Sequence, residues 1–255
     1  MARQKWIKEK KLAVDPSRDA YGEELKDYYK NGKGVVEIVE RDDGYIDYND
    51  AVPYYFSSYS DWSEPEKSAL SHCCGRVVDV GCGAGRIALH LQGKGHPVVG
   101  IDNSPGAIEV SRSRGVKELL NIPFTQIHGR VGKVDSFVLF GNNFGLFGSP
   151  RRARWLLRRL KSLSSSDALI IAQTTNPYST ENQDHLAYHE LNKKRGRLGG
   201  QLRIRIRHKR TIGPWMDYLF VSKQELEHIV KGTGWAVQQY VDSGSPGYFL
   251  ILERD

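Results

Sequence analysis

Cysteine is scarce in this sequence, with three residues among 255. An odd and small number in a chain of this length argues against a disulfide framework. Cys73 and Cys74 are adjacent and Cys82 lies inside a glycine-rich segment, so no paired CxxC spacing indicates a zinc site. This cysteine usage predicts a reducing compartment, and we expect a cytoplasmic protein.

Long apolar runs are also lacking. None approaches the about 20 residues that a helix needs to cross a bilayer. The basic segment 1–11 is not followed by an apolar run, so we expect neither a secretory signal nor a membrane partner. The hydrophobic content of 39% is still sufficient for a sizeable core. The length suits one large domain, or one domain with an elaborated lid.

Acidic residues are outnumbered by basic ones, which gives a net charge of +7. Such a balance suits an anionic partner, such as nucleic acid or a carboxylate or phosphate substrate. A solvated, arginine-rich surface gives the same balance and is the commoner case. Charge alone therefore leaves nucleic-acid binding open.

The middle of the chain alternates apolar runs with helical patterns. Ser104 followed by Pro105 is a favoured helix start, and it opens one of these helices. This βαβ rhythm predicts an α/β fold with an open, mostly parallel sheet and helices on both faces. Two further strands at the C-terminal end would close the sheet as an antiparallel hairpin, which makes seven strands. The predicted strands are 76–80, 97–101, 116–122, 134–140, 168–174, 235–241 and 248–253.

Two segments lie outside this alternation. Residues 1–69 form an N-terminal extension, which we expect to act as a cap on an α/β domain spanning 70–255. It contains a predicted hairpin around Asp42-Asp43-Gly44. The insertion 176–221 follows the fifth strand and is too long for a plain loop, so we expect a lid that contains β-structure.

The strand 201–209 within the lid alternates apolar residues with arginines. This pattern places Leu202, Ile204, Ile206 and His208 on one face. Such a strand can cover a pocket with its apolar face, or it can lie along phosphates with its arginines. We favour the lid.

The most informative segment is Val77-Val78-Asp79-Val80-Gly81-Cys82-Gly83-Ala84-Gly85-Arg86. A buried strand here enters a tight glycine turn and then a helix, whose free N–H groups suit a nucleotide ligand. Asp102 ends the next strand about twenty residues after the first glycine, where a carboxylate can accept both ribose hydroxyls. A dinucleotide site would have its third glycine at position 86, which is arginine here.

This segment resembles motif I of the class I S-adenosylmethionine-dependent methyltransferases, an acid followed by xGxGxG. Ile101-Asp102-Asn103-Ser104 resembles their second motif. The resemblance covers residues 75–175 well and the last two strands loosely. It implies a Rossmann-like fold, a methyltransferase enzyme and S-adenosyl-L-methionine as the cofactor.

The resemblance also implies a set of cofactor-binding residues. Asp79 would support the amino end of the methionine part, although it can also hold the loop through N–H bonds. The loop would contact the methionine part and the ribose, Asp102 would bind the ribose hydroxyls, and the residue after the third strand would meet the adenine. The glycine-rich end of the fourth strand would face the transferring methyl, with Phe144 and Phe147 either excluding water or buried in the core. The expected cofactor-binding residues are Asp79, Gly81, Cys82, Gly83, Asp102, Asn103, Asn121 and Asn142.

Catalytic candidates lie on a predicted lid helix, 185–192. His185 and His189 stand four residues apart, and either imidazole could act as a general base. Tyr188 is a comparable candidate. The spacing also permits a metal, but no third ligand is evident and we predict none.

Four aromatic residues precede the first strand of the α/β domain. Tyr54, Tyr55, Tyr59 and Trp62 could fold over the cofactor and attract its sulfonium, or they could be core.

The expected function is methyl transfer to a small or medium-sized molecule with an N, O or C acceptor. An RNA-directed methyltransferase that uses the arginine-rich stretches, and a non-catalytic module that only binds the cofactor, are the alternatives.

Overall fold

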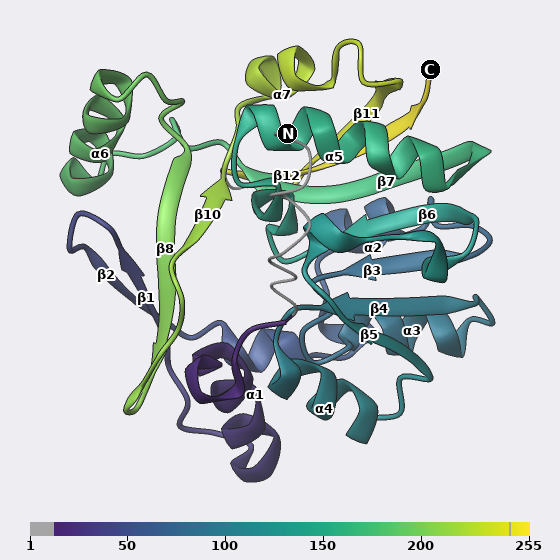
Figure 1. The fold of residues 1–255 in the computed structure, drawn as a ribbon, viewed down its shortest axis with the longest axis horizontal. Coiled ribbons are helices and arrows are strands. Elements are labelled where there is room, and N and C mark those ends of the chain that lie inside the picture. The colour runs from purple at the N-terminus through teal and green to yellow at the C-terminus, as the bar shows by residue number, and fades with distance from the viewer. Residues whose placement is uncertain (1–12, 245) are drawn as a thin grey trace, which may run out of the picture.

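The computed structural model describes residues 13–244 and 246–255, and it contains a seven-stranded sheet in the order β11-β12-β7-β6-β3-β4-β5 (Figure 1). Strand β12 is antiparallel to β11 and β7 on its two sides, and every other pair of neighbouring strands in this sheet is parallel. The predicted seven-stranded, mostly parallel sheet is thus confirmed. The strands are β3 (Val77–Val80), β4 (Val98–Asp102), β5 (Glu118–Asn121), β6 (Val134–Leu139), β7 (Ser164–Thr175), β11 (Trp235–Asp242) and β12 (Gly247–Arg254).

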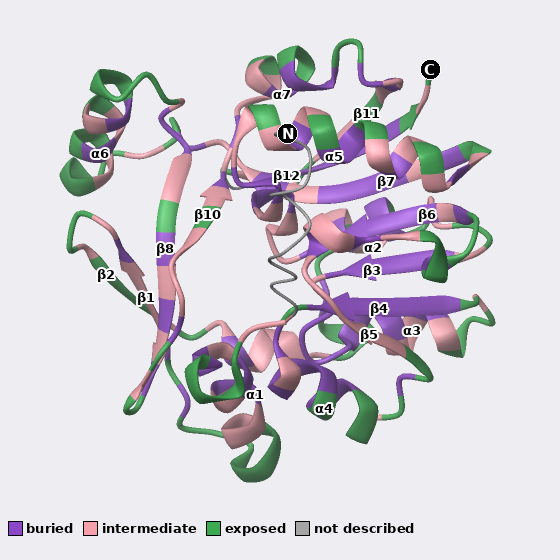
Figure 2. Cartoon of the chain, in the orientation of Figure 1, coloured by how far each residue is buried: buried purple, intermediate pink, exposed green. Residues whose placement is uncertain are grey.

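Helices cover both faces of this sheet. Helices α5 (Pro150–Leu163) and α7 (Lys223–Val230) share one apolar cluster with it, and α2 (Glu64–Leu70) and α3 (Arg86–Gly93) share another. Every residue of β3 and β4 is buried, as Figure 2 shows. The continuous apolar runs in the sequence arise from this double coverage.

Local signals set the helix starts as predicted. The Ser104 hydroxyl accepts a hydrogen bond from Ala107 N–H at 3.0 Å and opens α4 (Pro105–Ser113). Ser222 and Glu225 form a reciprocal capping box at the start of α7.

A second, antiparallel sheet lies apart from the first, and we call it the cap sheet (Figure 1). Its order is β10-β8-β1-β2, with β9 paired to β8. The predicted hairpin at Asp42-Asp43-Gly44 joins its first two strands. The cap sheet thus combines strands from the N-terminal extension and from the insertion. They are β1 (Glu37–Arg41), β2 (Ile46–Asn49), β8 (Gln201–His208), β9 (Thr211–Ile212) and β10 (Met216–Leu219).

Strand β8 has two unlike faces. Ile204 and Ile206 are buried on one face. On the other, Arg205 donates two hydrogen bonds to Glu40, at 2.7 and 2.8 Å, and Arg207 donates a third. These hydrogen bonds lower the pKa of Glu40 to about 2. The arginines are therefore paired within the cap sheet, which favours the lid interpretation of this strand.

Two further helices complete the cap region, α1 (Ala20–Asn31) and α6 (Gln183–Lys194). Across the described parts of the chain, no helix combines the length and apolarity that a membrane span requires. The segment 1–11, for which we expect no secretory signal, lies outside the described residues.

Candidate active site

The glycine loop joins β3 to α3 and is closely packed by side chains from other segments. Gly81 and Gly83 have φ values of 70° and 52°, which residues with a side chain rarely adopt. A Cβ on Gly81 would stand 2.5 Å from Asn143 Nδ2, and one on Gly83 would stand 2.6 Å from the Tyr21 hydroxyl. Glycine is therefore required at both positions, for conformation and for space.

Asp102 ends β4 beside this loop. Its buried carboxylate accepts hydrogen bonds from Gly83 N–H at 3.0 Å and from Ser104 N–H at 2.9 Å. Burial raises the pKa of Asp102 to about 6, against the opposing effect of these N–H donors. Asp102 and Asn103 both line the cavity described below.

Asp79 is also buried and lines the same cavity. Its Oδ2 accepts a hydrogen bond from Ala88 N–H at 3.2 Å, so it holds the start of α3. Burial raises its pKa to about 7, and the positive charge of Arg86 opposes that rise. The geometry is compatible with loop support and with ligand contact together.

Arg86, the residue that departs from the dinucleotide pattern, is buried next to the loop. Its Nη2 lies 2.5 Å from both Glu66 Oε1 and the Tyr54 hydroxyl. Its guanidinium stacks 3.9 Å from the centre of the Tyr54 ring. Its Nη1 is buried without a hydrogen-bond partner. An unpaired donor of this kind suits an anionic ligand group.

The end of β6 is held by polar side chains. Asn142 has a φ of 62°, its carbonyl accepts a hydrogen bond from the Tyr218 hydroxyl at 2.7 Å, and its Oδ1 accepts one from Thr175 at 3.1 Å. Asn143 Nδ2 donates to the carbonyls of Val80 and Gly81, at 3.0 and 2.9 Å. The two asparagines thus fix the strand end and the glycine loop to each other.

Phe144 and Phe147 belong to the core. Both are fully buried and neither lines the cavity, so packing rather than water exclusion at the site accounts for them.

Asn121 requires a correction, because it does not line the cavity. It is the last residue of β5, and its Nδ2 donates to the Asp102 carbonyl at 3.0 Å. The cavity wall on this side begins one residue later and consists of Ile122, Pro123, Phe124 and Thr125.

The three catalytic candidates all line the cavity, but their environments differ. The Tyr188 hydroxyl donates to Asp42 Oδ1 at 2.6 Å, and burial followed by that hydrogen bond raises its pKa to about 12. Burial, followed by the charge of His185, lowers the pKa of His189. His185 Nδ1 lies 3.3 Å from the Thr180 hydroxyl. Among the described residues, no group of three or more potential ligands is arranged to hold a metal ion.

The four aromatic residues before the first α/β strand lie in three different environments. Tyr54 and Tyr55 line the cavity, whereas Trp62 is buried in the core and Tyr59 is 40% exposed.

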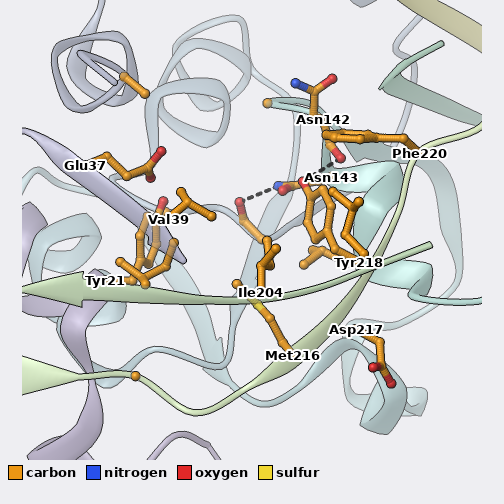
Figure 3. Close-up of a pocket in the computed structure, with 18 of the residues that line it drawn as sticks. Tyr21, Glu37, Val39, Asn142, Asn143, Ile204, Met216, Asp217, Tyr218 and Phe220 are labelled. Carbon is orange, nitrogen blue, oxygen red and sulfur yellow. Dashed lines mark hydrogen bonds between the residues drawn. The ribbon is translucent and has the colours of Figure 1, made fainter. Parts of the chain in front are cut away.

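One cavity of about 1100 Å³ connects all these parts. The glycine loop and the strand ends form one wall, and the inner face of the cap sheet forms the other. In Figure 3, Val39, Ile204 and Met216 from the cap sheet are drawn with Asn142 and Asn143 from the α/β domain. The site is therefore enclosed between two parts of the fold.

The sequence interpretation missed Tyr21, Glu37 and Arg86 as parts of this site. Tyr21 and Glu37 reach it only because α1 and β1 pack over strand ends that are distant in the chain, and no local pattern marks them. Arg86 could have been found, because an arginine directly after the last glycine is visible in the sequence.

A glycine loop followed by a strand-end carboxylate, on a sheet of this topology, defines a nucleoside-cofactor site in an α/β domain.

The family described as "Methyltransferase domain" matches residues 77–163, from β3 to the end of α5. A putative methyltransferase of Geobacillus sp. (strain WCH70) is 25% identical over 116 residues, which are 44% of this chain and 45% of that protein. The 2-heptyl-1-hydroxyquinolin-4(1H)-one methyltransferase of Mycobacteroides abscessus is 33% identical over 72 residues, 28% of this chain and 30% of that protein. The matches thus span less than half the length of either curated relative.

The fold extends the likeness beyond these segments. A crystal structure of an S-adenosylmethionine-dependent methyltransferase from Bacteroides fragilis, in complex with S-adenosyl-L-homocysteine, aligns with a TM-score of 0.80. The alignment covers 95% of this chain and 97% of that one, at 24% identity. Residues 77–163 therefore match a methyltransferase domain, and the chain has the fold of S-adenosylmethionine-dependent methyltransferases.

The residues present fit S-adenosyl-L-methionine, the cofactor of this family. Gly81 and Gly83 both line the cavity, so their backbone is within reach of a ligand there. The unpaired Nη1 of Arg86 suits the methionine carboxylate, and the Asp102 carboxylate suits the ribose hydroxyls.

Proposed function

We propose that this chain transfers the methyl group of S-adenosyl-L-methionine to a small or medium-sized molecule with an N, O or C acceptor. The observation that carries the proposal is the single cavity of about 1100 Å³ between the glycine loop and the cap sheet. Its position between two parts of the fold and its partly apolar lining suit a small ligand. A module that only bound the cofactor would not need the space beyond the methyl position.

The cofactor would lie along Asp79, Gly81, Cys82, Gly83, Asp102 and Asn103, with the end of β6 at Asn142 toward its methyl group. The chemistry it supplies is an activated methyl: the acceptor's electron pair forms a bond to the methyl carbon while the carbon–sulfur bond breaks and its electron pair stays on sulfur. The acceptor's proton leaves to a base or to water. Because the methyl is already activated, this chain's main contribution is positioning within an enclosed site.

The proton acceptor belongs to α6 in this proposal. His189 has a lowered pKa, so it is neutral near pH 7 and can take a proton. His185 lines the same part of the cavity and is the second candidate. Tyr188 is less suited, because its hydroxyl already donates a hydrogen bond to Asp42 and its pKa is raised to about 12.

The arginine-rich stretches support the small-molecule reading over an RNA substrate. On α5, Arg152, Arg154 and Arg159 donate hydrogen bonds to backbone carbonyls. On β8, Arg205 and Arg207 are paired with Glu40. Guanidinium groups held in this way are less available to phosphates than free ones.

An experiment with methyl-labelled cofactor tests the proposal. The protein is incubated with a small-molecule extract and, separately, with total RNA, and the Asp102→Asn variant is the control for cofactor dependence. We expect label in small molecules with the wild type and much less with the variant. Label that enters only RNA would contradict the proposal.

A further inference from the structure

Glu37 on β1 is a buried carboxylate that faces the cavity without a cation. Its side chain is 7% exposed, and Figure 3 shows it beside Tyr21 and Val39. The Tyr55 hydroxyl donates to its Oε1 at 2.9 Å. Within residues 13–244 and 246–255, no lysine, arginine or histidine forms an ion pair with it. A charge buried in this way is costly unless a positive group compensates it.

The cations of the cap sheet are committed elsewhere. Arg41 lies four residues after Glu37 on the same face of β1, but its guanidinium donates two hydrogen bonds of 2.8 Å to Asp43. On the opposite face of the cap sheet, Arg205 and Arg207 of β8 are paired with Glu40, and Arg203 is paired with Asp217. Although the protein has a net charge of +7, Glu37 lines the cavity without a paired cation.

Glu24 on α1 does not supply the missing charge. Both of its carboxyl oxygens are buried without hydrogen-bond partners. Burial, with the nearby charge of Glu37 second, raises its pKa to about 10. Glu24 is therefore neutral near pH 7 and supplies no positive charge. Burial raises the pKa of Glu37, and hydrogen bonding to Tyr55, Asn49 and Glu24 opposes that rise.

The surroundings of Glu37 suit an alkyl or arylalkyl ammonium group. Tyr21 and Tyr55 pack edge to face, with ring centres 5.7 Å apart, and both line the cavity. Aromatic faces attract cations, and Val39 and Ile204 add apolar surface for a hydrocarbon skeleton.

Two tyrosines place Glu37 near the reacting region. Burial, followed by negative charges that include Glu37, raises the pKa of both Tyr21 and Tyr218. The Tyr21 hydroxyl adjoins Gly83, and the Tyr218 hydroxyl donates to the Asn142 carbonyl. Glu37 and both tyrosines also line the same cavity as the glycine loop and the end of β6 (Figure 3).

We propose that Glu37 binds a protonated amine of the methyl acceptor, and that the substrate class is a small amine with an apolar skeleton. This inference rests on the proposed function, because it assigns the cavity beneath the cap sheet to the acceptor. Glu37 is a recognition residue in this account and takes no part in moving the proton of the reaction.

Binding to the protein saturated with S-adenosyl-L-homocysteine tests the inference without any turnover. The probes are matched pairs on one skeleton: n-hexylamine and n-hexanol, benzylamine and benzyl alcohol, tryptamine and tryptophol. We expect at least one amine to bind about tenfold or more tightly than its alcohol, as for a buried charge pair. In Glu37→Gln that preference falls to about one, and in Glu37→Asp, which keeps the charge, part of it remains.

Two controls separate the possible failures. Glu253→Gln removes one exposed negative charge from β12, away from the cavity, and should keep the full preference. Thermal melting of Glu37→Gln and Glu37→Asp verifies that each variant is folded, and the aspartate variant carries the test if the glutamine variant is not.

Three results would overturn the inference. No amine binds more tightly than its alcohol, or the preference survives in Glu37→Gln, or Glu37→Gln weakens S-adenosyl-L-methionine but not S-adenosyl-L-homocysteine. The last result would assign Glu37 to the sulfonium of the cofactor. Failure of both cofactor ligands to bind the wild type would instead reject the proposed function.

Discussion

Replacement of Asp102 by asparagine tests the cofactor site, because it exchanges one carboxylate oxygen for an amide NH₂ and removes the negative charge. The carboxylate is buried and accepts Gly83 N–H at 3.0 Å and Ser104 N–H at 2.9 Å, and it is the group we assign to the ribose hydroxyls. A hydrogen bond to a charged group contributes about 1.5–3 kcal/mol. Loss of the charge should therefore weaken the binding of S-adenosyl-L-methionine by about 10- to 150-fold.

The assay is titration calorimetry with both S-adenosyl-L-methionine and S-adenosyl-L-homocysteine. The two ligands share the ribose, so the loss should be equal for both. Asp135→Asn is a matched control, because that carboxylate also accepts a backbone N–H, from Arg76 at 2.8 Å, yet does not line the cavity. In each variant, an amide N–H₂ replaces a carboxylate oxygen that accepted a hydrogen bond from a backbone N–H. The free energy of unfolding should therefore fall by about 1–3 kcal/mol. Unchanged cofactor affinity in Asp102→Asn, or an equal loss in Asp135→Asn, would refute the assignment.

Three further predictions concern pH, stability and catalysis. Because the pKa of Asp102 is raised to about 6, its carboxyl gains a proton as the pH falls through that value. Calorimetry should therefore show a weaker cofactor affinity at pH values below about 6, and Asp102→Asn should remove this pH dependence. Arg86→Met leaves Glu66 buried without its cation and should lower the free energy of unfolding by about 3–5 kcal/mol in urea titrations. Adding Glu66→Gln should restore part of the lost free energy of unfolding. An unchanged urea midpoint in Arg86→Met would show that the pair is not buried as described. His189→Gln should lower kcat while the cofactor dissociation constant stays the same. It should also remove the acid limb of the pH–rate profile, which lies below the ordinary pKa of histidine because the pKa of His189 is lowered; retention of that limb would exclude His189 as the base.

The sequence was sufficient to predict the α/β sheet because its signals are local. Each buried strand is a short apolar run, and Ser104 and Ser222 cap the helices that follow. The glycine loop could be read for the same reason, since its conformation depends on Gly81 and Gly83 themselves.

The rest of the site depends on contacts between distant segments. Glu37 reaches the cavity only because β1 pairs with β8, far along the chain, and the β-period of two then turns it inward. Asn121 does not line the cavity whereas the next residue, Ile122, does, and along a strand a shift of one residue moves a side chain to the opposite face. Phe144 and Phe147 could not be assigned from the sequence, because a glycine-rich turn looks the same whether its aromatics meet a ligand or the core.

The most direct test of the central claim is calorimetric titration of the purified protein with S-adenosyl-L-methionine, S-adenosyl-L-homocysteine and NAD. The account predicts saturable binding of the first two at a single site and no binding of NAD, because Arg86 occupies the position of the third dinucleotide glycine. Binding of NAD alone, or binding of none of the three, would contradict it.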